Sequence, residues 1–141
     1  MGNTQSVKKI NFEDVQYAIR NTETHVLINT LDNSFQDCLL PNTISAEKEE
    51  HIVNHLISIG KTSIKVIVYG KNSNDEKIYK KYNQLSGLGF YNVNVYVGGM
   101  FEWLLLQDIY GIKEFPTTKK ELDLLRFKPN KALNVPLLEY T

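Results

Sequence analysis

The first residues with a spacing suited to chemistry lie at the amino terminus. Residue 2 is glycine, residue 6 is serine, and Lys8 and Lys9 follow. This is the N-myristoylation pattern, in which Met1 is removed and an acyl chain is joined to the amine of Gly2; the alternative is an unmodified terminus. One myristoyl chain attaches a protein only marginally, so a second contact is expected, such as a protein partner or self-association. Lys8 and Lys9 are expected to add about 1 kcal/mol each at an anionic surface.

Two further groups of reactive side chains are less suited to catalysis. Cys38 is the single cysteine, which excludes an internal disulfide and predicts a reducing, intracellular setting. It lies beside two leucines with no basic residue nearby in sequence, which favours an inert thiol over a nucleophile. His51 and His55 are spaced i, i+4, but no third ligand is evident, so neither a metal site nor a cofactor is predicted.

The bulk composition is that of one globular domain of 141 residues. Hydrophobic residues make up 42% and charged residues 23%, which argues against disorder. The basic and acidic residues number 16 each, so net charge does not predict a nucleic-acid partner. No apolar run approaches the roughly 20 residues that span a bilayer. The amino terminus also lacks the apolar core of a secretory signal.

The elements that must position these residues alternate between strand and helix. Apolar side chains at spacings of three and four predict helices over residues 12–20, 45–59 and 75–86. Short apolar or β-branched runs predict strands over residues 26–28, 64–69 and 93–97. Gly98 and Gly99 open a short aromatic helix, and a capping box from Thr118 predicts one more helix. This alternation predicts an α/β fold with a small, mostly parallel sheet flanked by helices.

The residues around the last predicted strand resemble the rhodanese family. Residues 89–93 read Gly-Phe-Tyr-Asn-Val, residues 95–99 read Val-Tyr-Val-Gly-Gly, and Trp103 follows. This block is similar to the family's glycine–aromatic–x–Asn–Val turn, strand, Gly-Gly pair and tryptophan. The resemblance covers about residues 10–118 and implies a small parallel sheet wrapped by helices. Residues 100–118 look more narrowly like the rhodanese-related proteins of large DNA viruses of eukaryotes.

The loop that carries the catalytic cysteine in active rhodanese domains departs from the family pattern. In the family, loop amides and a helix N-terminus stabilise the thiolate or persulfide. Here the resemblance places glycine at the cysteine position, and the loop reads Gly70, Lys71, Asn72, Ser73, Asn74 and Asp75. Without sulfur there is no nucleophile for a sulfane or phosphoryl group. Asp75 and Glu76 are expected to occupy the electropositive helix start themselves and to repel an incoming anion.

These features predict a catalytically inactive rhodanese-like module, a pseudoenzyme that works by binding or as a structural component. The expected divisions are a lipidated arm over residues 1–9, a rhodanese-like domain over 10–118, and a C-terminal helix and extended tail over 119–141. The expected contact surface is the aromatic segment that contains Phe101, Trp103, Leu104 and Tyr110. If the viral resemblance holds, the expected location is the cytoplasmic face of host membranes or the virion; otherwise it is the cytoplasm or a peripheral membrane site.

Two alternatives to this reading remain open at the level of sequence. The first is a sulfurtransferase that uses Cys38 or another unexpected residue as its nucleophile. The second is a binding protein whose vacant loop holds a small anion through Lys71, Asn72 and Ser73.

Overall fold

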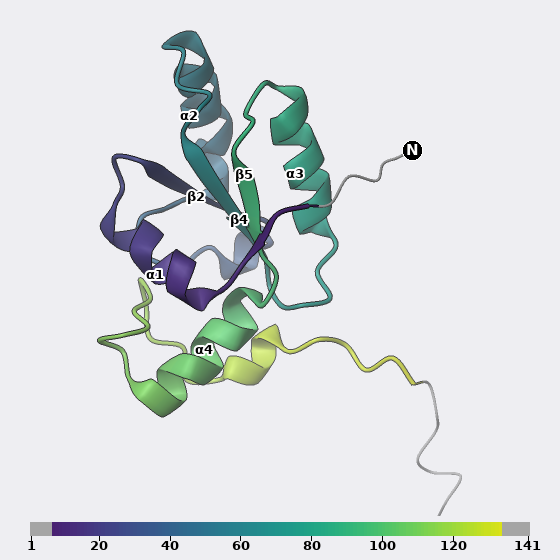
Figure 1. Cartoon of the computed structure of the whole chain (residues 1–141). Helices are drawn as coiled ribbons and strands as arrows, with labels where there is room; N and C mark the ends of the chain where they lie inside the picture. The colour runs from purple at the N-terminus through teal and green to yellow at the C-terminus, as the bar shows by residue number, and fades with distance from the viewer. Residues whose placement is uncertain (1–6, 134–141) are drawn as a thin grey trace, which may run out of the picture.

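The computed structural model describes residues 7–133, and its centre is a parallel sheet (Figure 1). Five strands pair in the order β1-β5-β4-β2-β3, and every pair is parallel. The strands are β1 (Lys9–Ile10), β2 (His25–Asn29), β3 (Thr43–Ile44), β4 (Lys65–Tyr69) and β5 (Val93–Tyr96). The strongly β-branched strand β4 is central and buried, as its composition predicts. The predicted α/β class is confirmed.

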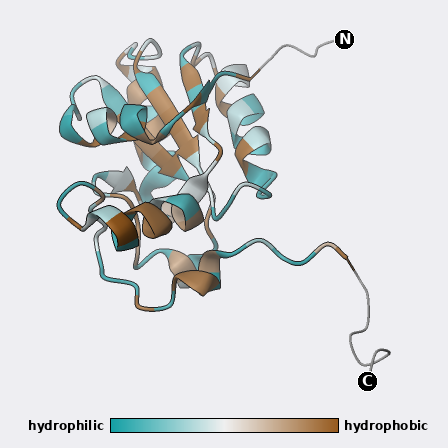
Figure 2. Ribbon diagram, turned by 60° about the horizontal axis from the view of Figure 1, so that its bottom comes forward, coloured by the Kyte–Doolittle hydropathy of each residue, from teal (hydrophilic) through white to brown (hydrophobic). Residues whose placement is uncertain are grey.

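Helices cover both faces of the sheet in the part of the chain that the structure describes. They are α1 (Phe12–Arg20), α2 (Ala46–Ser58), α3 (Lys77–Gly87) and α4 (Gly99–Tyr110). Side chains alternate along a strand, so Val66 and Val68 pack with α2 and α3, whereas Ile67 and Tyr69 pack with α1 and α4. Figure 2 shows the apolar strands enclosed by these helices. None of the helices within residues 7–133 is both long and apolar enough to cross a membrane.

Local capping explains where α1 begins, whereas the start of α2 is held by a more distant side chain. The Asn11 side chain accepts hydrogen bonds from the Glu13 and Asp14 amides at 3.0 and 3.2 Å, and the Asp14 carboxylate accepts one from the Asn11 amide at 3.2 Å. This reciprocal arrangement is a capping box, and it starts α1 at the predicted residue. Ser45 occupies the cap position of α2, but its side chain makes no capping hydrogen bond. The Ala46 amide donates instead to Gln36 Oε1 at 3.0 Å.

The two edge strands do not follow from the sequence pattern. Strands β1 and β3 have two residues each, too few to show the alternation that predicts a strand. Lys9 pairs with Val95, and the Lys8 carbonyl accepts a hydrogen bond from the Val95 amide at 2.9 Å. Lys9 therefore pairs in the sheet, although the predicted division assigns it to the arm over residues 1–9 and begins the domain at residue 10.

The helix predicted from the capping box at Thr118 does not form. The Thr118 hydroxyl accepts a hydrogen bond from the Leu39 amide at 3.0 Å and donates to the Asp37 carbonyl at 3.2 Å. These tertiary contacts compete with capping. The helical structure in this region is a short 3-10 helix, η2 (Leu124–Phe127), whose Phe127 is fully buried. One aromatic side chain therefore anchors the segment in place of an amphipathic helix.

Candidate functional site

The loop after β4 lies at the carboxyl edge of the sheet, where open α/β folds place their ligand sites. It runs from Gly70 to Glu76, and α3 begins at Lys77, two residues later than the sequence predicts. The loop passes beside the start of α4 (Figure 1). The structure therefore brings together the predicted loop and the Gly98-Gly99 segment, which are far apart in sequence.

The Asp75 carboxylate occupies the centre of this loop. Its Oδ2 accepts hydrogen bonds from the Thr30 hydroxyl and from the Lys71 amide, both at 3.1 Å. Its Oδ1 accepts one from the Lys77 amide at 2.9 Å, in the first turn of α3. Amides at a loop and a helix start are donors for an anion, so two of these donors are already used by a carboxylate of the same chain.

Gly70 has no free space for a side chain. A Cβ atom built on Gly70 would overlap Asp75 Oδ2 and would lie 2.7 Å from Thr30 Oγ1. Real Cβ atoms do not approach polar oxygens so closely, so any other residue at this position requires the Asp75 carboxylate to move. Gly70 and Asp75 are therefore sterically coupled, and the carboxylate stands where a residue at position 70 would place its first side-chain atom.

The start of α4 closes the loop from the other side. The amides of Met100 and Phe101 donate to the carbonyls of Gly70 and Lys71 at 3.0 and 2.9 Å. Gly99 makes this approach possible, because its φ is +65° and a Cβ there would lie 2.7 Å from the Gly70 carbonyl oxygen. These contacts use two N–H groups at the helix N-terminus for the loop backbone. The Gly-Gly pair thus has a packing role at this site.

Asn72 ties the loop to the C-terminal segment, a connection that the sequence does not indicate. The Asn72 side chain is buried; its amide donates to the Phe127 carbonyl at 2.9 Å, and its oxygen accepts from the Asn74 amide at 2.9 Å. The Phe127 ring lies 5.1 Å from the Phe35 ring, between centroids. The loop is therefore held between β4, α4 and η2, and Asn72 already uses both ends of its side chain.

A cavity of about 260 Å³ lies next to this loop and has lysines and carboxylates in its wall. Of the predicted loop residues, Lys71, Asn72, Asn74 and Asp75 line it, whereas the exposed Ser73 does not. The other lining residues are Thr30, Leu31, Asp32, Phe35, Lys77, Lys128 and Asn130. The Lys71 ammonium lies 4.8 Å from the centre of the Phe35 ring. Lys77 is paired with Asp32 at 2.9 Å, so the wall carries both signs of charge.

Cys38 lies elsewhere, in the core. Its side chain is 1% exposed, its Sγ donates to the Lys119 carbonyl at 3.3 Å, and it is not among the residues that line the loop cavity. Burial, followed by the nearby Glu121 and Asp37 carboxylates, raises the pKa of the thiol. A thiol with a raised pKa is a poor nucleophile at neutral pH.

Two buried tyrosines at the ends of β4 and β5 hydrogen-bond to the elements around the site. The Tyr69 hydroxyl accepts a hydrogen bond from the Leu40 amide at 3.1 Å and shares one with Thr43 at 2.8 Å. The Tyr96 hydroxyl donates to the Glu102 carboxylate of α4. Burial raises the pKa of both tyrosines, so both phenols stay protonated at neutral pH and serve as fixed hydrogen-bonding groups between strands, loop and helix.

The predicted contact surface on α4 is partly wrong. Trp103 and Leu104 are buried, and the Trp103 indole donates to the Pro116 carbonyl at 2.9 Å, so neither side chain can meet a partner. Phe101 is half-buried, whereas Tyr110 is exposed. The helix carries apolar side chains on several faces, and the sheet, Phe115 and η2 cover only part of them. The other exposed apolar side chains of this region are Leu105, Ile109, Ile112, Leu122 and Leu125.

The remaining predicted residues lie apart from the loop. Lys8 and Lys9 are exposed at the edge strand β1, and Gly2 lies outside the described residues. His51 and His55 are exposed on α2. Within residues 7–133, no three histidine, cysteine or carboxylate side chains come close enough to hold a metal ion.

The similarities to known proteins concern the fold. No family model and no curated protein matches the sequence. The structure is similar to the solution NMR structure of the rhodanese-like domain of the Alr3790 protein from Anabaena sp., with a TM-score of 0.56, 21% identity, and coverage of 93% of this chain and 91% of that one. It is also similar to the single-domain sulfurtransferase RDL2 of Saccharomyces cerevisiae, with a TM-score of 0.53, 14% identity, and coverage of 77% and 98%.

A third similar structure is the As–Sb reductase from Leishmania major, with a TM-score of 0.51, 18% identity, and coverage of 74% of this chain and 79% of that one. At these identities the likeness establishes the fold alone. The chain has a rhodanese-like fold, as the resemblance of residues 89–103 implies.

Proposed function

We propose that this protein is a catalytically inactive rhodanese-like module that works by binding, and that a myristoyl group on Gly2 holds it next to a membrane. The observation that carries the first part is the Asp75 carboxylate, which occupies the loop at the point where a side chain of residue 70 would begin. Sulfur transfer needs a thiolate that attacks and then holds a sulfane sulfur, and Gly70 supplies no such atom.

Electrostatics supports the same conclusion. A carboxylate that accepts from the Lys71 and Lys77 amides neutralises the donors that a persulfide or an oxyanion would use. It also repels an incoming anion at short range. The Asp75 carboxylate thus takes the place in the loop that a bound anion would otherwise occupy.

The alternative with Cys38 as nucleophile has little support, because this thiol is buried in the core and its pKa is raised. The test is thiocyanate formation from thiosulfate and cyanide by the purified protein. We expect no rate above the protein-free reaction, in wild type and in Cys38→Ser alike. A measurable rate that disappears in Cys38→Ser would establish the sulfurtransferase alternative.

A small anion is the second candidate ligand, because Lys71, Lys77 and Lys128 line the cavity beside the loop. The Lys77–Asp32 ion pair and the Asp75 carboxylate oppose it. Titration with sulfate, thiosulfate or phosphate decides the matter, because a ligand that binds only the folded state raises the melting temperature with concentration. A rise that is lost in Lys71→Ala but kept in Lys80→Ala, which lies outside this cavity, would favour the anion-binding function.

The membrane part of the proposal is supported by the pattern of Gly2, Ser6, Lys8 and Lys9. If the viral resemblance of residues 100–118 holds, the cytoplasmic face of host membranes or the virion is the place for such a protein. Expression with an alkyne-myristate probe in a eukaryotic host is the test. We expect label on wild type and none on Gly2→Ala, and equal labelling of both would refute it.

The protein-contact part of the proposal uses the exposed apolar side chains of α4 and the segment after it. Two lipid signals suffice for stable anchoring where one does not, so self-association would place two acyl chains on one assembly. Sedimentation analysis of wild type and of Ile109→Asp tests this. The Ile109 residue is 70% exposed and Tyr110 is 65% exposed. Because Ile109 is not part of the core, Ile109→Asp should lower self-association without loss of stability. Equal sedimentation of both proteins as monomers would refute self-association.

A further inference from the structure

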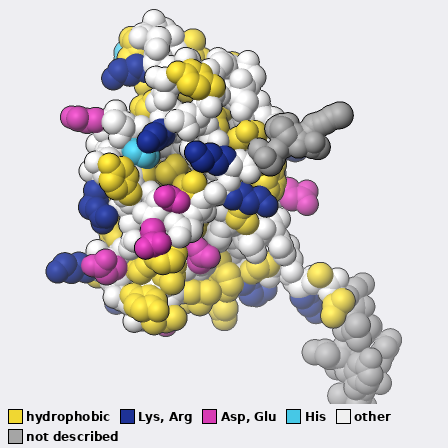
Figure 3. Space-filling view, in the orientation of Figure 1, with side chains coloured by type: hydrophobic (Ala, Val, Ile, Leu, Met, Phe, Trp, Pro, Cys, Tyr) yellow, Lys and Arg dark blue, Asp and Glu magenta, His cyan; other side chains and the backbone are white. Residues whose placement is uncertain are grey.

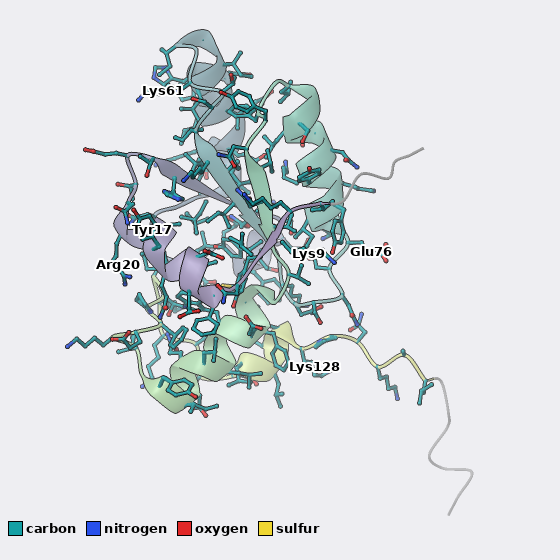
Figure 4. All side chains as sticks on the ribbon, viewed as in Figure 1. Lys9, Tyr17, Arg20, Lys61, Glu76 and Lys128 are labelled. Carbon is teal, nitrogen blue, oxygen red and sulfur yellow. The ribbon has the colours of Figure 1, made fainter. Side chains whose placement is uncertain are left out.

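Four exposed lysines line two neighbouring hollows beside the first residues of β1 and β4. Lys8 and Lys9 lie at the entry to β1, Lys65 begins β4, and Lys61 lies in the turn before it. Lys8, Lys9 and Lys65 line one shallow hollow, and Lys61 and Lys65 line a second hollow that shares Tyr17 and His25 with the first. We call the four lysines the amino-edge cluster. Figure 4 labels Lys9 and Lys61 on the face toward the viewer, with Tyr17, and Figure 3 shows basic side chains across that face.

The lysines of the amino-edge cluster are not neutralised by ion pairs within the described residues. Within residues 7–133, none of the four forms an ion pair, whereas Lys77, Lys81 and Lys119 are each paired with a carboxylate. The acidic residues that line the two hollows are Asp14 and Glu23. Four ammonium groups therefore face two carboxylates, and this edge carries a local excess of positive charge on a chain whose net charge is zero.

The lipid attachment point lies within reach of these lysines. Strand β1 is parallel to β5, and its first residue, Lys9, is level with Val95 of β5 and with Val68 of β4, so Lys8 precedes it on the side toward the start of β4. Gly2 lies six residues before Lys8, and an extended chain spans at most about 3.6 Å per residue. The amine of Gly2 therefore stays within about 22 Å of Lys8 in any conformation of the intervening residues.

We infer that the amino-edge cluster binds anionic lipid headgroups and supplies the second contact that a single myristoyl chain needs. This inference rests on the proposed acylation of Gly2. An acyl chain inserted within reach of Lys8 brings this edge to the bilayer surface, where the lysines lie within a Debye length of the headgroups. Tyr17, which is 55% exposed between the two hollows, adds an amphipathic ring of the type enriched at membrane interfaces.

The experiment compares three myristoylated proteins on two kinds of vesicle. They are wild type, Lys61→Glu/Lys65→Glu, and the control Lys48→Glu/Lys80→Glu, whose exposed lysines lie on α2 and α3, outside both hollows, and form no ion pair among the described residues. Both variants change the net charge equally. The vesicles contain phosphatidylcholine alone, or phosphatidylcholine mixed with phosphatidylserine.

One lysine near an anionic surface strengthens binding about fivefold. Loss of two therefore weakens binding to the mixed vesicles at least about 25-fold in Lys61→Glu/Lys65→Glu. The control should stay close to wild type, and binding to phosphatidylcholine alone should be similar for all three proteins. Equal binding of the two variants to mixed vesicles would overturn the inference, because net charge would then explain the whole effect.

The failure of this inference can be distinguished from failure of the proposed acylation. Intact mass of each protein before the vesicle measurement reports the myristoyl group directly. If Gly2 is not acylated in a eukaryotic host, the proposed membrane attachment is refuted. If Gly2 is acylated and the variant of Lys61 and Lys65 binds like the control, only the headgroup contact is refuted.

Discussion

The steric coupling of Gly70 and Asp75 makes a quantitative prediction for Gly70→Ala. The new Cβ overlaps Asp75 Oδ2, so the carboxylate must rotate away and lose its hydrogen bonds to the Thr30 hydroxyl and the Lys71 amide. A hydrogen bond to a charged group contributes about 1.5–3 kcal/mol. Asp75 is partly exposed, so the lower end applies, and Gly70→Ala should lower the free energy of unfolding by about 3 kcal/mol.

A double-mutant cycle isolates this coupling. Asp75→Ala loses the same hydrogen bonds and removes the carboxylate, which leaves the Thr30 hydroxyl 2.7 Å from the new Cβ. Without Asp75 this hydroxyl is free to rotate, so a further Gly70→Ala should cost less than about 1 kcal/mol, which gives a coupling energy of about 2 kcal/mol. The assay is urea unfolding of the wild type, the two single variants and the double variant. Gly87→Ala is the matched control, because a Cβ on Gly87 has no atom within 4 Å.

The reasoning fails if Gly70→Ala costs the same free energy with and without Asp75. A further consequence concerns Gly70→Cys, which restores a cysteine at the family position. Its Cβ meets the same carboxylate, so it should be as destabilising as Gly70→Ala. In the Asp75→Ala background, Gly70→Cys should add little to the cost that Asp75→Ala already carries.

Three further predictions concern the contacts around the loop and the edge of the sheet. Gly99→Ala should destabilise by at least about 2 kcal/mol in urea unfolding, because φ is +65° and the Cβ would lie 2.7 Å from the carbonyl oxygen of residue 70; a neutral effect comparable to Gly87→Ala would contradict the close approach. Asn72→Ala should cost about 1–3 kcal/mol and should speed amide exchange in η2, since Asn72 holds that segment; unchanged exchange would show that η2 is held by other contacts. Burial, opposed by a backbone contact and reinforced by Lys65, lowers the pKa of His25 below 6.5. The unfolded state then binds more protons than the folded state just below pH 6.5, so stability should fall as the pH drops through this range. His25→Gln should flatten that slope in melting temperatures, and an unchanged slope would assign it to other groups.

Much of the architecture could be predicted from local pattern. The β-branched run of β4 predicts a central strand, and the reciprocal capping of Asn11 and Asp14 starts α1 at the predicted residue. These signals suffice because they depend on neighbours in sequence: side-chain periodicity, caps and strand propensity act over a few residues. The same reasoning fails at Thr118. The capping pattern is good, but the Thr118 hydroxyl instead bonds the backbone of Asp37 and Leu39, which are far from it in sequence.

At the candidate site, too, the residue types could be predicted from the sequence but the tertiary contacts could not. The absence of a cysteine at residue 70 and the presence of a carboxylate at residue 75 can be read directly from the sequence. The position of that carboxylate against Thr30, the tie from Asn72 to Phe127, and the burial of Trp103 and Leu104 could not be read in this way.

The sequence by itself determined the three inner strands and the four α-helices, the composition of the loop and the charge of each residue. Only the tertiary structure decided which distant groups meet there, because parallel pairing gathers chain segments far apart in sequence at one edge of a sheet. The carboxyl edge brings Thr30, Asp75 and Gly99 to one loop, and the pairing of the strands brings Lys8 and Lys65 to one hollow. The pairing of β1 with β5 places Lys8 and Lys9 there, and a strand of two residues is too short to be predicted from the sequence pattern.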